Sequence, residues 1–258
     1  MTHAQEKTTG AIAITGKGGV GKTTTASLII RYLKENSAGP ILALDADPDA
    51  NLATALGIAV ETTIGDLRED VLRNIRDIPA GMSKDTYVQA GLHEIIVETP
   101  KVDLITMGRA EGPGCYCYIN NLLRKFADEL MPSYQWVVID NEAGMEHLSR
   151  RTASQIDHLI VVVNECPLSV DCAGRIDQLL GELGQNVRNK YFILNAVRTD
   201  RLEAVKDRMA ASSLEYLGAV PRDDALEEII FRGESIYALE NGPVMGIIAD
   251  MMQKIGVR

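Results

Sequence analysis

The chain has 258 residues, 46% of them hydrophobic, and a formal net charge of −10. A chain of this length can bury one large core, and its acidic balance excludes a broad non-specific nucleic-acid surface, which needs clustered Lys and Arg side chains. No run approaches the ~20 apolar residues that span a bilayer, and the polar residues 2–7 lack the apolar core of a signal peptide. We therefore expect one cytoplasmic domain over residues 1–258, with residues 1–9 as a flexible tail and with neither a membrane nor a nucleic acid as partner.

The first predicted strand, residues 11–14, leads into a glycine-rich loop, residues 16–24, and then into a helix that ends near residue 36. The loop fits the pattern G-x-x-x-x-G-K-[ST]. Its glycines let successive backbone N–H groups point at phosphate oxygens, Lys22 reaches the β- and γ-phosphates, and the Thr23 hydroxyl ligates Mg²⁺. The residues expected to contact the nucleotide here are Gly18, Gly19, Val20, Gly21, Lys22, Thr23 and Thr24.

The next apolar run, residues 41–44, ends in the sequence Asp-Ala-Asp-Pro-Asp at residues 45–49. Open α/β sheets bind their ligands at the carboxyl ends of such strands. Two interpretations stay open for these carboxylates. They form a turn that caps the next helix through Asn51, or they position water and support Mg²⁺ beside the glycine loop.

Residues 58–100 carry no obvious chemistry. Residues 63–75 and 84–96 have helical spacing with many charges, and we expect them to form a helical excursion over the sheet. A third strand then fits residues 103–107.

Two thiols separated by one residue, Cys115 and Cys117, follow the sequence Glu-Gly-Pro-Gly at residues 111–114 and precede a predicted helix at 119–131. Two thiolates make half of a tetrahedral or square-planar metal site, and a second copy of the chain across a two-fold axis would supply the other half. A reactive redox pair and ordinary packing are the other interpretations. The remaining cysteines, Cys166 and Cys172, are predicted to be small buried residues.

The fourth predicted strand, residues 135–140, ends at Asp140, which has the Walker B position for holding Mg²⁺. Further strands fit residues 158–163, 191–195 and 215–220, with helices at 170–183 and 201–213 between them. Near-continuous apolar strands separated by amphipathic helices predict an α/β class fold with a mainly parallel, doubly wound central sheet flanked by helices. With the glycine loop after the first strand, the prediction is a P-loop NTPase fold.

Polar residues also end the later strands. Asn195 and the turn Pro221-Arg222-Asp223 lie where a base-binding amide and a backbone clamp are useful, although as isolated residues they read as loop residues. The apolar face of residues 244–255 lacks an opposing basic face, so we expect this helix to pack on the sheet rather than on a membrane.

The loop at residues 16–24, with its extra Lys17, resembles the deviant Walker A motif of the MinD/ParA/nitrogenase-iron-protein class. The Cys-x-Cys motif with its preceding Gly-Pro-Gly, together with residues 140–151, resembles more narrowly the CooC-type ATPases that mature nickel carbon monoxide dehydrogenase and their relatives serving acetyl-CoA synthase. The resemblance implies an ATP-hydrolysing metallochaperone that forms a homodimer and delivers nickel to the apo form of one of these enzymes.

The resemblance also implies residue roles. Lys17 reaches the partner's phosphates, Lys22 serves the nucleotide of its own subunit, and Asp47 positions the attacking water. Thr23 and Asp140 hold Mg²⁺. Asn195, Pro221 and Arg222 contact the adenine of ATP or ADP, and Cys115 with Cys117 binds Ni²⁺ or Zn²⁺ across the dimer.

Two alternatives share much of this pattern. In an iron–sulfur electron-transfer ATPase, the same four thiolates would hold a cluster between the subunits. In a MinD/ParA-type positioning ATPase, the target would be a membrane or DNA, which the acidic composition disfavours.

Overall fold

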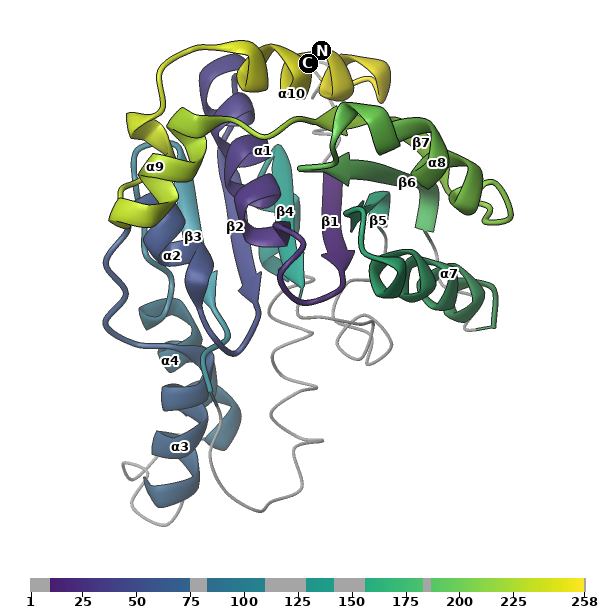
Figure 1. Cartoon of the computed structure of the whole chain (residues 1–258). Helices are drawn as coiled ribbons and strands as arrows, with labels where there is room; N and C mark the ends of the chain where they lie inside the picture. The colour runs from purple at the N-terminus through teal and green to yellow at the C-terminus, as the bar shows by residue number, and fades with distance from the viewer. Residues whose placement is uncertain (1–9, 75–82, 110–128, 142–155, 183–186, 258) are drawn as a thin grey trace, which may run out of the picture.

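The computed structural model describes residues 10–74, 83–109, 129–141, 156–182 and 187–257. Seven strands form one sheet in the order β3-β2-β4-β1-β5-β6-β7, and each ladder between these described strands is parallel. The predicted parallel, doubly wound α/β fold is therefore confirmed (Figure 1). The strands are β1 (Gly10–Gly16), β2 (Ile41–Ala46), β3 (Val102–Thr106), β4 (Trp136–Asn141), β5 (Ile156–Val163), β6 (Val187–Asn195) and β7 (Glu215–Val220).

Apolar side chains alternate between the two faces of the sheet and build a separate core on each. One core is covered by α1 (Lys22–Asn36), α2 (Asn51–Leu56), α9 (Asp224–Arg232), η3 (Ile236–Ala238) and α10 (Pro243–Lys254). The other is covered by α3 (Ile64–Asn74), α4 (Lys84–Glu94), α7 (Pro167–Glu182) and α8 (Leu202–Met209). Short 3-10 turns, η1 (Met131–Ser133) and η2 (Thr199–Arg201), complete the described elements.

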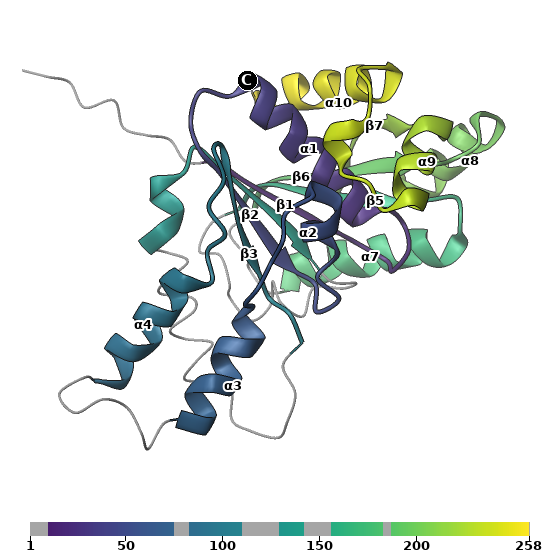
Figure 2. The same ribbon diagram turned by 90° about the vertical axis from the view of Figure 1, so that its left-hand side faces the viewer.

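The predicted excursion at residues 58–100 consists of α3 and α4. The two helices pack on each other, and Figures 1 and 2 show them extending beyond the carboxyl ends of β2 and β3. Leu67 and Val71 of α3, with Val88 and Leu92 of α4, are buried in the same core as Ile105 of β3. The two helices therefore pack against the edge of the sheet from which the loops after β2 and β3 emerge.

The C-terminal helix α10 packs on α1 and β7, as expected from its apolar face. Most of the predicted helix at 119–131 lies outside the described residues. Within the part of the chain that is described, no helix has the length and apolar character required to cross a bilayer.

Candidate active site

The glycine loop follows β1, the middle strand of the sheet, and leads into α1 (Figure 1). Gly16, Gly19 and Gly21 have φ values of +147°, +76° and +93°, a region that favours glycine because it has no Cβ. Lys22 begins α1 and is buried, with 7% of the residue exposed. The loop thus turns the N-terminus of a 15-residue helix toward the carboxyl edge of the sheet, an arrangement that binds phosphate.

A side chain from the other half of the sheet supports this loop. The Asn195 side-chain amide, at the end of β6, donates a hydrogen bond of 2.8 Å to the Val20 carbonyl oxygen. A Cβ added at Gly21 would collide with the Asn195 side-chain nitrogen, so Gly21 also permits the close approach. Asn195 therefore braces the phosphate loop, and its contact with the base stays a prediction.

Two buried carboxylates lie beneath the loop on neighbouring strands. Asp45 of β2 and Asp140 of β4 are in register, and both side chains face the side of the sheet that α1 covers. The Thr23 hydroxyl donates a 2.6 Å hydrogen bond to Asp140 Oδ2, whereas Asp140 Oδ1 is buried and has no hydrogen-bond partner among the described residues. Thr23 and Asp140 are thus brought together as predicted, and their oxygen atoms suit Mg²⁺.

Burial dominates the electrostatics of this pair. Desolvation raises the pKa of Asp140 to about 7 against the lowering effect of the Thr23 hydrogen bond, and the Asp45 charge raises it further while Lys22 lowers it. Desolvation likewise raises the pKa of Asp45 to about 6, although the backbone N–H groups of Leu52 and Asp47 lower it. A positive charge placed between Thr23 and Asp140 would stabilise the ionised form of the Asp140 carboxylate.

The turn after β2 presents the next carboxylate, Asp47. Asp45 fixes this turn, because Asp45 accepts hydrogen bonds from the backbone N–H groups of Asp47 (3.2 Å) and Leu52 (2.9 Å). Asp47 Oδ1 accepts one from the N–H of Asp49 (3.0 Å). The turn leads into α2 at Asn51, with Ala50 at the N-cap and no side-chain cap there, and Asp45 accepts instead from the N–H of Leu52 in the first turn. Water positioning and support of Mg²⁺ by these carboxylates stay predictions.

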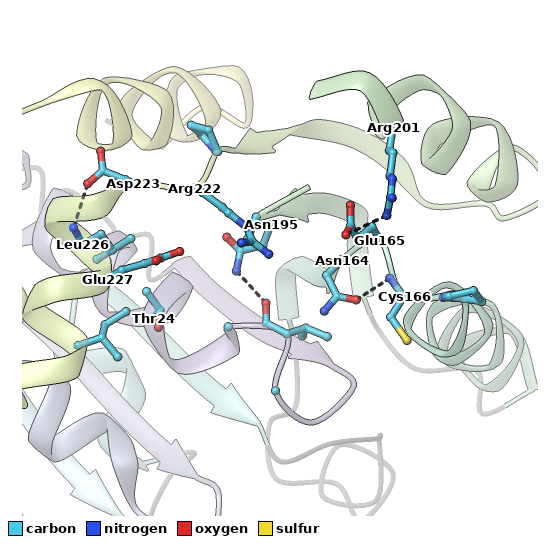
Figure 3. A pocket seen from close by; sticks show the side chains of 17 residues that line it. Thr24, Asn164, Glu165, Cys166, Asn195, Arg201, Arg222, Asp223, Leu226 and Glu227 are labelled. Atoms are coloured by element: carbon cyan, nitrogen blue, oxygen red, sulfur yellow. Dashed lines mark hydrogen bonds and ion pairs between the residues drawn. The ribbon is translucent and has the colours of Figure 1, made fainter. Parts of the chain in front are cut away.

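A cavity of about 620 Å³ opens beside the phosphate loop (Figure 3). Its lining includes Asn195, Pro221 and Arg222, the three residues predicted to contact the base, together with loop residues 19–21 and Thr24. Two walls were not predicted. One comes from α9 through Leu226 and Glu227, and the other from the end of β5.

The β5 wall consists of Asn164, Glu165 and Cys166, with Glu165 paired to Arg201 at 3.1 Å. The sequence did contain a signal for this wall, because the apolar run of β5 ends in polar residues. The same pattern identified residues 45–49 and Asp140. Cys166 is half-buried and so is Cys172 on α7, so the prediction that both are buried was wrong. Cys166 is partly exposed because it lines the cavity at the end of β5, and Cys172 packs against the core from α7 without being fully covered.

The second predicted centre cannot be placed in the same way, since Cys115 and Cys117 lie outside the described residues. Among the residues that are described, no group of three or more His, Cys, Asp or Glu side chains has the arrangement of a metal site. Lys17 is half-exposed on the loop.

Comparison with known proteins identifies the family. The model of the CobQ/CobB/MinD/ParA nucleotide binding domain, CbiA, matches residues 11–236. The chain is 40% identical to the ATP-binding protein MJ0685 of Methanocaldococcus jannaschii over 247 residues, which cover 95% of this chain and 97% of that protein. It is 29% identical to the carbon monoxide dehydrogenase accessory protein CooC of Rhodospirillum rubrum over 260 residues, with coverages of 95% and 97%.

Solved structures show the same fold. A chain of the MinC:MinD cell division protein complex of Aquifex aeolicus matches with a TM-score of 0.71 at 24% identity, covering 96% of both chains. A ParA family ATPase from Chlorobium tepidum matches with a TM-score of 0.71 at 19% identity, covering 95% of this chain and 97% of that one. The phosphate loop, the carboxylates beneath it and the family match agree: the chain belongs to the CobQ/CobB/MinD/ParA nucleotide-binding family and is a P-loop ATPase.

Proposed function

We propose that this ATPase is a metallochaperone whose ATP-dependent dimerisation controls a metal site made by Cys115 and Cys117, and that it delivers nickel to apo carbon monoxide dehydrogenase or acetyl-CoA synthase. The observation that carries the proposal is the end-to-end similarity to CooC, at 29% identity over 95% of the chain, in a sequence that contains a Cys-x-Cys motif. Two thiolates per chain call for a second chain, because sulfur-rich nickel and zinc sites use about four ligands.

The nucleotide site supplies the energy for this cycle. Backbone N–H groups of the glycine loop and the buried Lys22 stabilise negative charge on the transferring phosphoryl group. Thr23 and Asp140 would hold Mg²⁺, which when bound neutralises charge on the β- and γ-phosphates. The base and ribose of ATP would occupy the 620 Å³ cavity between Asn195 and the Pro221-Arg222 turn.

Asp47 is assigned to water positioning. Its backbone N–H donates to Asp45, which fixes the turn, and its carboxylate accepts from the N–H of Asp49. Replacement by Ala should lower kcat about 100-fold or more while leaving the Kd for ATP within a few-fold, because general-base or water-positioning groups contribute on that order. Steady-state hydrolysis and equilibrium binding, measured on the same preparation, separate the two quantities.

Lys17 is assigned to the partner's nucleotide. Two such loops facing each other would place each Lys17 near the phosphates of the other subunit, where a positive charge stabilises the transition state. Metal binding and ATP-driven dimerisation then strengthen each other, since coupling between two sites is reciprocal.

Anaerobic nickel titration of wild type and the Cys115→Ser/Cys117→Ser variant tests the metal site. Wild type should bind about one nickel per two chains, with higher affinity when a non-hydrolysable ATP analogue is present, and the variant should lose this binding. The matched control is Cys166→Ser/Cys172→Ser, which removes the other two cysteines and should keep it. Unchanged nickel stoichiometry in the Cys115→Ser/Cys117→Ser variant would remove the motif from the proposal.

The same preparations separate the alternatives. Stoichiometric iron and sulfide in an anaerobic preparation would replace nickel delivery by cluster-based electron transfer. ATP-dependent co-sedimentation with liposomes or DNA would favour a positioning ATPase. An affinity for nickel that is the same with and without the ATP analogue would refute the coupling between metal binding and the nucleotide.

A further inference from the structure

The lining of the cavity beside the phosphate loop includes three carboxylates, and they differ in their partners. Glu165 pairs with Arg201 at 3.1 Å, and the Asp223 side chain accepts a 2.9 Å hydrogen bond from the N–H of Leu226. Glu227 lines the same cavity, and within the described part of the chain its carboxylate has neither a hydrogen bond nor an ion pair. Both of its oxygen atoms are therefore available to accept hydrogen bonds from a bound ligand.

The first turn of α9 fixes where this carboxylate lies. The N–H of Glu227 donates a 2.9 Å hydrogen bond to the Asp223 carbonyl oxygen, and the neighbouring Leu226 is buried in the core beneath α1 and α10. Figure 3 shows the Glu227 side chain pointing from α9 toward Asn195, above Thr24 in this view. The backbone of Glu227 is thus anchored, and its side chain lies between the phosphate end of the cavity and the end expected to hold the base.

The chemistry of ATP limits what such a group can bind. A carboxylate only accepts hydrogen bonds, and its charge repels the phosphates, so it can favour the nucleotide only through a donor on the nucleoside. The nucleoside has few donors, namely the amino group of the base and the two hydroxyls of the ribose. The ribose joins the phosphates to the base, which is the stretch of the cavity that Glu227 faces. Dinucleotide-binding folds likewise use an Asp or Glu to accept from a ribose hydroxyl.

We infer that Glu227 is a specificity-determining residue that accepts hydrogen bonds from the ribose hydroxyls and so favours ribonucleotides over deoxyribonucleotides. The inference concerns the nucleotide and not the metal, and it rests on the placement of the nucleoside in this cavity proposed above. A hydrogen bond to a charged group is among the stronger ones, and its loss in this open cavity should weaken binding about tenfold.

Equilibrium binding of ADP, 2′-deoxy-ADP and 3′-deoxy-ADP with Mg²⁺ tests the assignment, because these nucleotides carry the nucleoside and are not consumed by an ATPase. Wild type should bind at least one of the two deoxynucleotides about tenfold more weakly than ADP. Glu227→Ala should bring this ratio of Kd values about fivefold or more closer to 1. Since the ratio compares ligands of equal charge, the general electrostatic effect of removing a carboxylate cancels.

The adjacent residue offers a matched control. Glu228 lies on the same helix, pairs with Arg232 at 2.6 Å and is not part of the cavity lining. Glu228→Ala removes the same charge from α9 and should leave the ratio at its wild-type value. Inorganic pyrophosphate measures binding by the phosphate loop alone, and wild type should bind it about tenfold or more weakly than ADP, since it lacks the contacts of the nucleoside.

The outcomes separate the inference from the placement on which it rests. Equal affinities of wild type for ADP and both deoxynucleotides overturn the inference, and so does a ratio that persists in Glu227→Ala. A ratio that falls as far in Glu228→Ala also overturns it, because the effect would then belong to the charge of the helix. Pyrophosphate that binds as tightly as ADP refutes the placement of the nucleoside in the cavity, and the inference with it.

Discussion

Replacing Gly21 by Ala tests the brace on the phosphate loop. Gly21 has a φ of +93°, and an added Cβ would lie far inside the 3.4 Å at which ordinary van der Waals contact with the Asn195 side-chain nitrogen begins. The new side chain therefore demands two changes at once. The backbone must accept a conformation unfavourable to Ala, and Asn195 must leave the Val20 carbonyl oxygen to which it donates.

The two costs have separate magnitudes. A left-handed backbone costs a residue with a Cβ about 1–2 kcal/mol, and loss of the hydrogen bond costs about 1 kcal/mol. Together they amount to about 2–3 kcal/mol against the loop conformation that binds phosphate, equivalent to an increase of about 30- to 150-fold in the Kd for ATP.

Equilibrium binding of a fluorescent ATP analogue to wild type, Gly21→Ala, Asn195→Ala and the double variant measures these costs. Asn195→Ala removes both the donor and the atom with which the new Cβ collides, so the double variant should lose about 1 kcal/mol less than the sum of the single losses. Gly233 serves as the control, because its φ is +65° and an added Cβ there would meet nothing within 4 Å. Gly233→Ala should lower the free energy of unfolding by about 1 kcal/mol and leave ATP binding intact.

Two results would refute this reasoning. Wild-type affinity in Gly21→Ala would show that the loop binds phosphate in another conformation. Strict additivity of the two single losses would show that Gly21 and Asn195 act independently.

Further predictions concern the buried carboxylate and a buried guanidinium. In EDTA and without nucleotide, Asp140→Asn should match wild type in stability near pH 4 and exceed it by about 2–4 kcal/mol at pH 8, as urea unfolding at both pH values would measure. The direction follows from the pKa of Asp140, which is 3.8 in the unfolded chain and is raised to about 7 in the folded protein. Relative to Asp140→Asn, wild type therefore has its full stability below pH 3.8 and loses part of it as the pH rises through 7. Equal stabilities of the two proteins at pH 8 would contradict this reasoning. Arg31→Lys should lower the free energy of unfolding by about 2–3 kcal/mol, because the buried guanidinium donates through three nitrogens, to the carbonyl oxygens of Ile236 and Leu239 and to the Asn241 and Glu35 side chains, and a single ammonium cannot reach all four acceptors. The control Arg73→Lys, on an exposed side chain, should change it by less than about 0.5 kcal/mol, and an equal effect of the two would be a contrary result.

Much of the fold was predictable because the strands are buried on both faces. Continuous apolar runs such as residues 158–163 identify strands without alternation, and glycine-proline breaks separate them from helices. The predicted strand boundaries were wrong where a strand continues into polar residues. β6 begins at Val187, four residues before the predicted start, since Arg188, Asn189 and Lys190 lie where solvent reaches the sheet edge.

The helix α9 was missed for a related reason. It has nine residues, and Phe231 is 86% exposed, so its apolar residues do not mark one buried face. The Asp223 side chain caps the N-terminus of α9 by accepting a hydrogen bond from the N–H of Leu226. The sequence analysis assigned Asp223 to the turn Pro221-Arg222-Asp223 and so did not use it as a helix cap. Without α9, one wall of the nucleotide cavity could not be foreseen.

The residues that gather at the phosphate loop could be named one by one from the sequence, but their contacts could not. The loop pattern identified Lys22 and Thr23, and the strand end identified Asp140. That Asp45 stands beside Asp140 depends on β2 and β4 being neighbours, and that Asn195 reaches Val20 depends on a contact across 175 residues. Neither follows from local spacing.

This last contact has a consequence for the order in which the chain folds. β1 has β4 and β5 as its partners, so the strand made first must wait for residues more than a hundred positions away. The donor to Val20 is synthesised later still. A nascent chain that ends before Asn195 contains the whole glycine-loop motif but lacks the side chain that hydrogen-bonds to Val20. The phosphate loop should therefore form late in folding. Because these contacts join residues far apart in the sequence, folding should also be slow.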